Sequence, residues 1–243
     1  MEKFGEITVP TIKERFIERL SGMIFSGQLK VGEKLPSERE MAAAMKVSKS
    51  IVHTGMEALA QMGLVRVKPQ SGTYVADYMK EGNMDTLNAM VKYGGKNMDE
   101  QLRQIFLDLR MATEGLAFQR LAERRTEADM EALRREAAEI GSFMREQEEP
   151  ELQQLAEMFF HFHRQIGIRS GCAMMPFLMN AIYDVAIDVW EDYLRVTDPE
   201  DALALLDLFL DRIEAGDGDG AVALLREGIE TYNQRSRQGC PAV

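Results

Sequence analysis

The chain has 243 residues, 45% hydrophobic and 28% charged, which excludes disordered and fibrous proteins and leaves room for two modest domains or one large one. The first ten residues contain no apolar run, and no uncharged stretch is long enough to cross a bilayer, so neither a secretory signal nor a membrane span is expected. Cys172 and Cys240 lie too far apart for a zinc ribbon or a disulfide framework. We therefore expect a soluble cytoplasmic protein.

The net charge of −11 is unevenly distributed along the chain. Residues 1–76 hold 11 Lys and Arg against 8 Asp and Glu, a net of +3, whereas residues 77–243 hold 18 against 32, a net of −14. A basic unit joined to a larger acidic unit is the pattern expected of an anion-binding head on a solvated body.

Residues 1–76 predict three helices followed by a hairpin. Apolar residues recur at helical spacing up to a C-capping glycine at Gly27. Ser37 with Glu40 three residues later is typical of a capping box, which predicts a short helix over 38–45, and another helix begins at Ser48. Leu64–Ala76 has β-branched residues on both sides of a Pro-Gln-Ser-Gly turn. This order predicts a winged helix-turn-helix domain.

The rest of the chain reads as helical. Residues 77–97 predict a linker with a short helix, and residues 98–243 show no strand pattern. The expected helices are 98–124, 127–146, 151–169, 173–196, 199–215 and 220–235, with candidate N-caps at Thr126, Thr197 and either Asp217 or Asp219. Short connections between them predict an all-α bundle of six to seven helices.

The start of the second helix of a helix-turn-helix enters the major groove, while cations and backbone groups hold the phosphates. In this chain the first turns of that helix are polar, an arginine precedes them, and the hairpin tip is small enough to lie along the minor groove. The candidate DNA-binding residues are Arg39, Ser48, Lys49, Ser50, His53, Gln70, Ser71 and Gly72. The alternative is that Ser48–Ser50 only caps a helix.

Several motifs resemble the N-terminal domain of GntR-type bacterial transcription regulators. They are Leu35-Pro-Ser-Glu-Arg-Glu40, Val47-Ser-Lys-Ser-Ile-Val52, Glu57-Ala-Leu59, Gly63-Leu-Val65 and Gly72-Thr-Tyr-Val75. The resemblance implies a winged helix-turn-helix that binds palindromic double-stranded operator DNA as a homodimer. The family often has Arg where this chain has Lys49 and His53; neither offers a bidentate fork, so we expect altered base recognition.

Residues 98–235 resemble the all-α effector domain, of the FCD type, found in the FadR branch of this family. The motifs are Arg110 with Glu114, Phe162-His163-Arg164, Ser170-Gly171 and Ile213 with Gly216-Asp217. This resemblance implies effector binding and dimerisation by residues 98–243. Many members of the branch hold a divalent metal through one carboxylate and three histidines, and that metal orients a carboxylate ligand.

This chain departs from the metal-binding pattern. His163 is in the register of one ligand, but the other three positions fall at Phe159 and at about Leu206 and Gly228. Glu157 and His161 are an alternative i, i+4 pair, roughly on the opposite side of the helix from His163 and without partners from other helices. We therefore expect no metal and no cofactor.

Without a metal, a buried cation is the natural partner for an anionic effector. The candidate effector-binding residues are Arg110 and His163, with Tyr183 and Trp190 as weaker candidates. The alternatives are that Arg110 only pairs with Glu114 at i, i+4, and that His163 is a core histidine. The effector is expected to be an organic acid or an acyl-type molecule, although an aromatic residue of acyl-CoA-binding members finds no match at 231–235.

The sequence thus predicts a ligand-responsive repressor that is released from its operator by a small anionic metabolite. The alternative is a non-sensing regulator or adaptor that keeps DNA binding and uses its acidic helical domain for protein partners. An enzyme is not expected, because the chain has no GxSxG, HExxH or P-loop motif and Cys172 has no histidine at catalytic spacing.

Overall fold

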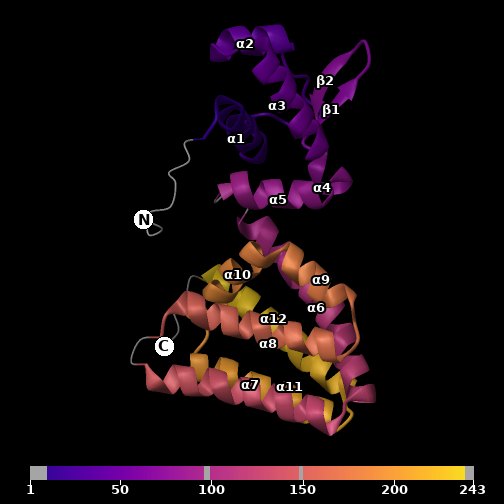
Figure 1. The fold of residues 1–243 in the computed structure, drawn as a ribbon, viewed down its shortest axis with the longest axis vertical. Coiled ribbons are helices and arrows are strands. Elements are labelled where there is room, and N and C mark those ends of the chain that lie inside the picture. Colours follow the sequence, from indigo (N-terminus) through magenta and orange to yellow (C-terminus); the bar gives the residue numbers. More distant parts are fainter. Residues whose placement is uncertain (1–9, 96–98, 148–149, 239–243) are drawn as a thin grey trace, which may run out of the picture. The chain divides into compact units, whose positions relative to one another are not determined.

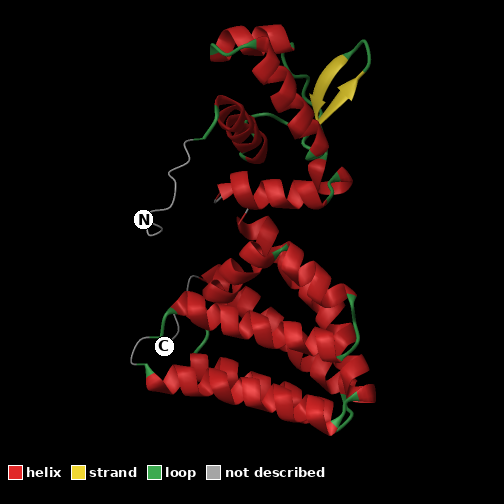
Figure 2. Ribbon diagram, in the orientation of Figure 1, coloured by secondary structure: helices red, strands yellow, loops and turns green. Residues whose placement is uncertain are grey.

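The computed structural model describes residues 10–95, 99–147 and 150–238, and the chain divides into two compact units, Met1–Leu102 and Arg103–Val243. Helices dominate both units, and strands occur only in the first among the residues described (Figure 2). Among the described helices, none is both long enough and apolar enough to cross a membrane.

The first unit is the predicted winged helix-turn-helix (Figure 1). Its main elements are α1 (Ile12–Phe25), α2 (Glu38–Met45), α3 (Lys49–Gln61), β1 (Val65–Lys68) and β2 (Gly72–Val75). Buried apolar side chains from α1 and α3 form its core, among them Leu20, Ile24, Val52 and Leu59. Gly55 lets α3 approach α1 closely, because a Cβ at this position would lie 2.4 Å from the Phe16 ring.

Local hydrogen bonds explain where the helices of this unit begin and end. The Ser37 side chain accepts from the Glu40 backbone N–H, and the Glu40 carboxylate accepts from the Ser37 backbone N–H, so the predicted capping box is confirmed. Lys46 ends α2 in the left-handed region at φ 54°. This conformation produces the short turn after which Ser48 caps α3.

The wing is an antiparallel pair in which Val65 faces Val75 and Lys68 faces Gly72. The segment before α2 extends this pairing, since the Leu35 N–H donates to the Thr73 carbonyl at 2.8 Å. Gln70 and Gly72 both have positive φ at the tip of the wing. Glycine adopts positive φ without strain, which suits position 72.

Residues 77–95 form two helices, α4 (Tyr78–Glu81) and α5 (Met84–Tyr93). Helix α5 packs against α1. The buried Thr86 hydroxyl donates to the Met62 carbonyl at 2.7 Å. Most of the segment expected to be a linker is therefore folded onto the first unit; residues 96–97 lie outside the described residues.

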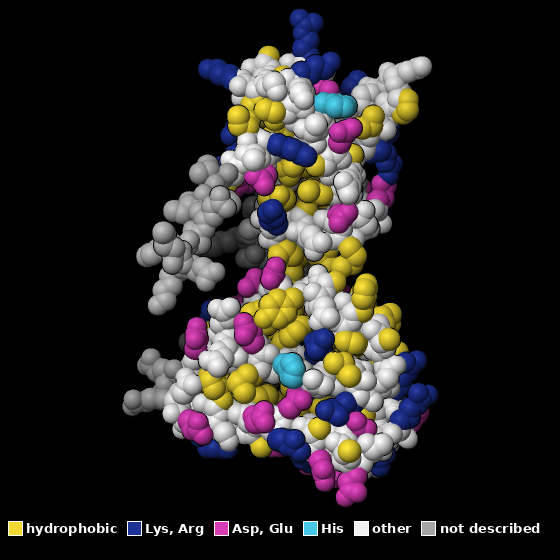
Figure 3. All heavy atoms as spheres, in the orientation of Figure 1, with side chains coloured by type: hydrophobic (Ala, Val, Ile, Leu, Met, Phe, Trp, Pro, Cys, Tyr) yellow, Lys and Arg dark blue, Asp and Glu magenta, His cyan; other side chains and the backbone are white. Residues whose placement is uncertain are grey.

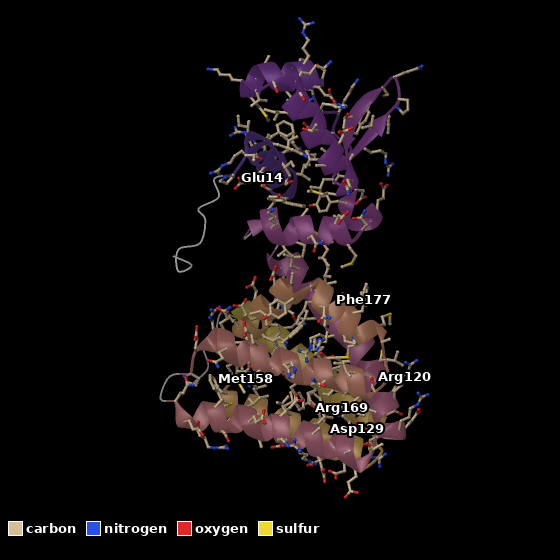
Figure 4. The ribbon with its side chains drawn as sticks, viewed as in Figure 1. Glu14, Arg120, Asp129, Met158, Arg169 and Phe177 are labelled. Atoms are coloured by element: carbon tan, nitrogen blue, oxygen red, sulfur yellow. The ribbon has the colours of Figure 1, made fainter. Side chains whose placement is uncertain are left out.

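The second unit is an all-α bundle in which the structure describes seven helices. They are α6 (Asp99–Arg124, part of this unit from Arg103 on), α7 (Glu127–Glu146), α8 (Leu152–Arg169), α9 (Met174–Ala181), α10 (Tyr183–Val196), α11 (Pro199–Glu214) and α12 (Gly218–Gln238). Helix α8 packs against α7, α9 and α10, while α11 packs against α7 and α12. Arg169 of α8 pairs with Asp129 of α7 at 3.2 Å (Figure 4).

Two local predictions in this unit were wrong. The helix expected over 173–196 is two helices, interrupted at Ile182 with φ −119° and ψ 26°. Neither glycine nor proline marks the interruption, since Pro176 lies in the first turn of α9, where proline is tolerated. Helix α11 is capped by Asp198 instead of Thr197, because the Asp198 carboxylate accepts from the Glu200 N–H at 2.9 Å.

Candidate functional site

The start of α3 presents polar side chains to solvent, as a recognition helix requires. Ser48, Lys49, Ser50 and His53 are all exposed. The Ser48 oxygen accepts a hydrogen bond from the Ile51 N–H at 3.3 Å, so this residue does cap the helix. The Ser48 hydroxyl can still donate a hydrogen bond, so capping is compatible with DNA contact.

Two carboxylates hold the His53 imidazole. Nδ1 lies 2.9 Å from Oε1 of Glu38 on α2, and Nε2 lies 3.5 Å from Oε1 of Glu57 on α3. The hydrogen bond to Glu38 raises the pKa of His53, and the Glu57 charge acts in the same direction. The i, i+4 spacing of Glu57 is readable from the sequence, whereas the contact with Glu38 depends on how α2 packs on α3.

Cations surround this surface, and Figure 3 shows Lys and Arg side chains projecting around the end of the first unit that carries α2 and the wing. Arg39 is exposed on α2. Lys46 is exposed at the turn before α3 and was not among the predicted DNA-binding residues. Its charge and its place in the turn of the helix-turn-helix could have identified it from the sequence. Either side chain can neutralise a phosphate.

The wing tip is exposed at all three predicted positions, Gln70, Ser71 and Gly72. The Ser71 hydroxyl and the Tyr74 phenol are 2.7 Å apart and share a hydrogen bond. A Cβ at Gly72 would lie 2.9 Å from the Lys34 side chain. This close approach, together with its φ of 120°, favours glycine here.

The second unit encloses a cavity of about 20 Å³, which is room for about one water molecule. Five helices, α6, α8, α10, α11 and α12, contribute to its wall. Aromatic rings make up much of the wall: Phe106, Phe159, Trp190, Tyr193, Phe209 and Tyr232. Arg110 and His163 also line it, so three of the four predicted effector residues meet at one cavity.

Arg110 and Glu114 form a buried bidentate ion pair. Nε and Nη2 of Arg110 donate to the two Glu114 carboxylate oxygens at 2.9 and 3.0 Å. The exposed fraction is 11% for the Arg110 side chain and 1% for Glu114. The pairing expected as an alternative role for Arg110 therefore exists, and it leaves other N–H groups of the guanidinium to face the cavity.

His163 and Trp190 complete this polar cluster. Nδ1 of the buried His163 lies 3.2 Å from Oε2 of Glu114, although the two groups are not aligned for a hydrogen bond. The His163 ring stacks on Trp190 with centroids 4.9 Å apart, and the Arg110 guanidinium lies 4.4 Å from the Trp190 ring centroid. Trp190 is thus a platform for both cationic candidates.

The charge state of the cluster follows from competing effects. Burial raises the pKa of Glu114, but Arg110 and His163 together lower it further, to about 2, so the carboxylate is ionised. Burial lowers the pKa of His163, and this outweighs the opposing effect of Glu114. The imidazole is therefore neutral at pH 7, and the cluster holds one positive and one negative charge.

Tyr183 does not line the cavity. It is 40% exposed at the start of α10 and lines a surface groove, with its ring edge-on to Phe160 at 5.1 Å. Two turns of helix, a rise of about 11 Å, separate it from Trp190. Its position on the same helix as Trp190 therefore does not place it beside the cluster.

Comparison with known proteins assigns both units. The model of bacterial regulatory proteins of the gntR family matches residues 12–75, and the FCD domain model matches residues 106–231, about half of the chain. The chain belongs to the GntR family, with an FCD effector domain. This GntR regulator is accordingly a DNA-binding transcription regulator of the FadR-like branch and not an enzyme.

Named relatives agree with this assignment. The regulator is 30% identical over 174 residues to the HTH-type transcriptional regulator LutR of Bacillus subtilis, covering 72% of this chain and 75% of LutR. It is 28% identical over 112 residues to the HTH-type transcriptional repressor YtrA of the same organism, covering 46% and 79%. A solved structure of Lar from Listeria monocytogenes shares the fold, with a TM-score of 0.57 and 15% identity over 96% of this chain and 99% of that one.

The residues of this regulator do not fit the metal site found in many members of its branch. Phe159, Leu206 and Gly228 line the same cavity as His163, and none of the three offers a ligand atom. Both oxygens of Glu114 already accept from Arg110. Within the described ranges, no cluster of three or more His, Cys, Asp or Glu side chains is placed to hold a metal ion.

The alternative pair near His163 has a different environment. His161 is exposed and its Nδ1 lies 3.3 Å from Oε2 of Glu136 on α7, in the surface groove that also contains Glu157. It takes no part in the buried cluster.

Proposed function

We propose that this GntR regulator represses transcription by binding operator DNA through α3 and the wing, and that a small acidic molecule in the FCD cavity releases it. The observation that carries the proposal is the buried cluster of Arg110, Glu114 and His163 beside an aromatic cavity. Such a cluster is costly to bury and suits recognition of a polar ligand, and it lies in a chain whose other unit exposes a recognition helix.

On the DNA side, Ser48, Lys49, Ser50 and His53 reach base edges or the adjacent backbone. Arg39 neutralises a phosphate, and the wing tip follows the minor groove. A homodimer places two such heads on the halves of a palindrome, so protein symmetry sets the half-site spacing. The regulator then acts where its operator is, in the cytoplasm.

On the effector side, the cavity has little free volume, so a metabolite has to displace side chains or helices to enter. A ligand that prefers the opened state lowers operator affinity in proportion to that preference.

The test is selection of bound fragments from a genomic DNA library, followed by salt titration of the recovered operator. We expect a palindromic site and a logarithm of affinity that falls steeply and linearly with the logarithm of salt concentration. Lys49→Ala should weaken binding and reduce the slope, while Lys92→Ala, outside the DNA-binding surface, should change neither. Absence of any selected sequence, or a flat salt response, would contradict the proposal.

An adaptor role is the second candidate, favoured by exposed apolar side chains on α9. Phe177 is 70% exposed (Figure 4) and Met174 is 52% exposed. A broad metabolite panel separates the two roles, because a ligand that prefers the native state raises the melting temperature. Stabilisation by an organic acid favours sensing, and its absence across the panel favours the adaptor.

A further inference from the structure

Two of the polar side chains that line the FCD cavity, Arg110 and Trp190, have only donors. The Trp190 indole N–H is buried and makes no hydrogen bond to any residue that the structure describes. Arg110 uses Nε and Nη2 for Glu114, and in the described chain no hydrogen bond engages its Nη1. A buried donor calls for an acceptor, so the polar group of a ligand here is a carbonyl or carboxylate oxygen.

The described wall offers one cationic side chain to an anionic ligand. Arg110 is the single Lys or Arg side chain among the described lining residues, and its counter-charge, Glu114, lies behind it outside the wall. The other titratable side chains that face His163 or line the wall are Tyr193 and Tyr232, which are uncharged at pH 7. A second carboxylate on the ligand would therefore be buried without a partner, at high cost.

The remaining wall is apolar. Phe159, Leu206 and Gly228 provide rings, methyl groups and space around His163 where a metal would need ligand atoms. A chelating hydroxy acid or a polycarboxylate thus gains nothing from this wall, whereas a flat or branched hydrocarbon body contacts it throughout.

We infer that the cavity takes a small monocarboxylate with an aromatic or branched apolar body, bound without a metal ion, whose carboxylate is held by Arg110 and the Trp190 indole N–H. This inference rests on the proposed function in taking the cavity as the effector site. It goes beyond that proposal in fixing the class of effector and the residues that receive its acidic group.

The test uses the full-length protein, dialysed against EDTA, with benzoate as the probe. Isothermal titration should show benzoate binding that is unchanged by added Zn²⁺ or Ni²⁺. Benzamide, the uncharged isostere, should bind at least about tenfold more weakly, a difference of about 1.4 kcal/mol at 25 °C. Citrate, which carries more charge than one guanidinium can balance, should not bind.

Arg110 variants leave Glu114 buried without its partner and are expected to unfold, so Trp190→Phe carries the residue-level test. It removes the N–H and keeps an aromatic ring, and should weaken benzoate binding about tenfold. The smaller ring should also lower the melting temperature of the free protein, so circular dichroism checks that the variant stays folded. Tyr183→Phe is the matched control, because it removes a polar hydrogen from an aromatic side chain outside the cavity and should leave benzoate affinity unchanged.

Four results would overturn the inference: binding that requires added metal, equal affinity for benzoate and benzamide, an unchanged affinity in Trp190→Phe, or no binding of benzoate. Operator binding, measured separately, distinguishes its failure from that of the proposed function. If citrate with Ni²⁺ releases operator and benzoate does not bind, the inference fails and the function stands. If benzoate binds as described but never alters operator affinity, the cavity chemistry stands and the release mechanism fails.

Discussion

The Glu114 carboxylate is ionised at a position with almost no access to water. Burial of one charge costs several kcal/mol, and the pair with Arg110 offsets this through two hydrogen bonds of good length and through the electrostatic attraction of opposite charges at close range. Arg110 has no comparable second acceptor in the part of the chain that the structure describes. The two charges therefore depend on each other, and removal of either leaves a buried ion.

Glu114→Gln tests this dependence. The substitution keeps the shape but removes the charge, so the free energy of unfolding should fall by about 3–5 kcal/mol, as expected when a buried pair loses one member. Urea unfolding followed by fluorescence of Trp190, the single tryptophan, reports directly on this cluster. The matched control is Glu191→Gln, which removes the charge from an exposed pair with Arg195 and should cost less than about 1 kcal/mol. Equal effects of the two substitutions would contradict the prediction.

His53 leads to a prediction about pH. Glu38 raises its pKa above the ordinary value of 6.5, so the folded protein favours the protonated imidazole, which donates from both nitrogens. As pH rises through the raised pKa the charge is lost, and Glu38 and Glu57 are left uncompensated beside the duplex, with Lys49 the nearby cation. Operator affinity should therefore fall severalfold as the pH rises above 6.5 and through the raised pKa of His53.

The measurement is operator affinity against pH at constant ionic strength. His53→Gln should remove most of the pH dependence, whereas His161→Gln, an exposed histidine of the second unit, should preserve it. An unchanged profile in His53→Gln would assign the pH dependence to other groups.

Sequence reasoning identified individual side chains of the cavity but not most of the contacts between them. Arg110 and His163 were named because a cation inside an acidic helical domain suits an anionic ligand, Trp190 was a weaker candidate, and the ion pair with Glu114 follows from i, i+4 spacing. The stacking of His163 and Arg110 on Trp190 joins three helices and depends on packing, which no local pattern records. Tyr183 was included for its residue type alone, and the structure places it at the surface.

At the scale of elements, the contact between α1 and α3 determines how the recognition helix is held. Gly55 is buried in α3 directly against the Phe16 ring of α1. Neither helix can move closer or rotate much without a clash, since protein interiors are close-packed. The orientation of α3 therefore follows from this contact.

Gly55→Ala should destabilise the first unit by about 1–3 kcal/mol, because the added methyl group overlaps Phe16. Gly22→Ala is the matched control in α1: a Cβ there meets nothing within 4 Å, so the gain in helix propensity should stabilise by about 0.5–1 kcal/mol. Thermal unfolding followed by circular dichroism measures both. Stabilisation by Gly55→Ala would show that α1 and α3 can separate at little cost.

Helix positions were predictable where local chemistry determines them. The bounds of α2 follow from the box of Ser37 and Glu40, and α7 begins after Thr126 because its hydroxyl and the Asp129 carboxylate cap each other's backbone. The interruption at Ile182 was not predictable, because residues 173–196 have continuous helical periodicity and no breaker between Pro176 and the end. Both α9 and α10 pack against α8, a tertiary arrangement that no local pattern records.

At the scale of the whole molecule, the two parts of the chain differ in net charge and should therefore interact differently with nucleic acid. The net +3 of residues 1–76 attracts a polyanion, while the net −14 of residues 77–243 repels it. We therefore expect nonspecific adhesion to nucleic acid to be weak and operator binding to depend on the proposed contacts of α3 and the wing. A regulator of this kind can be released by a modest loss of operator affinity.

Release by an effector has a thermodynamic consequence for the whole molecule. If benzoate in the cavity weakens operator binding by some factor, operator DNA must weaken benzoate binding by the same factor, because the two paths around the binding cycle have equal free energy. A factor of about 5–150 is expected for a coupling free energy of about 1–3 kcal/mol. Operator affinity measured with and without saturating benzoate, and benzoate affinity measured with and without saturating operator, give the two values independently. A scrambled duplex of the same length should leave benzoate affinity unchanged, and unequal factors would show that another equilibrium, such as dimer dissociation, takes part in release.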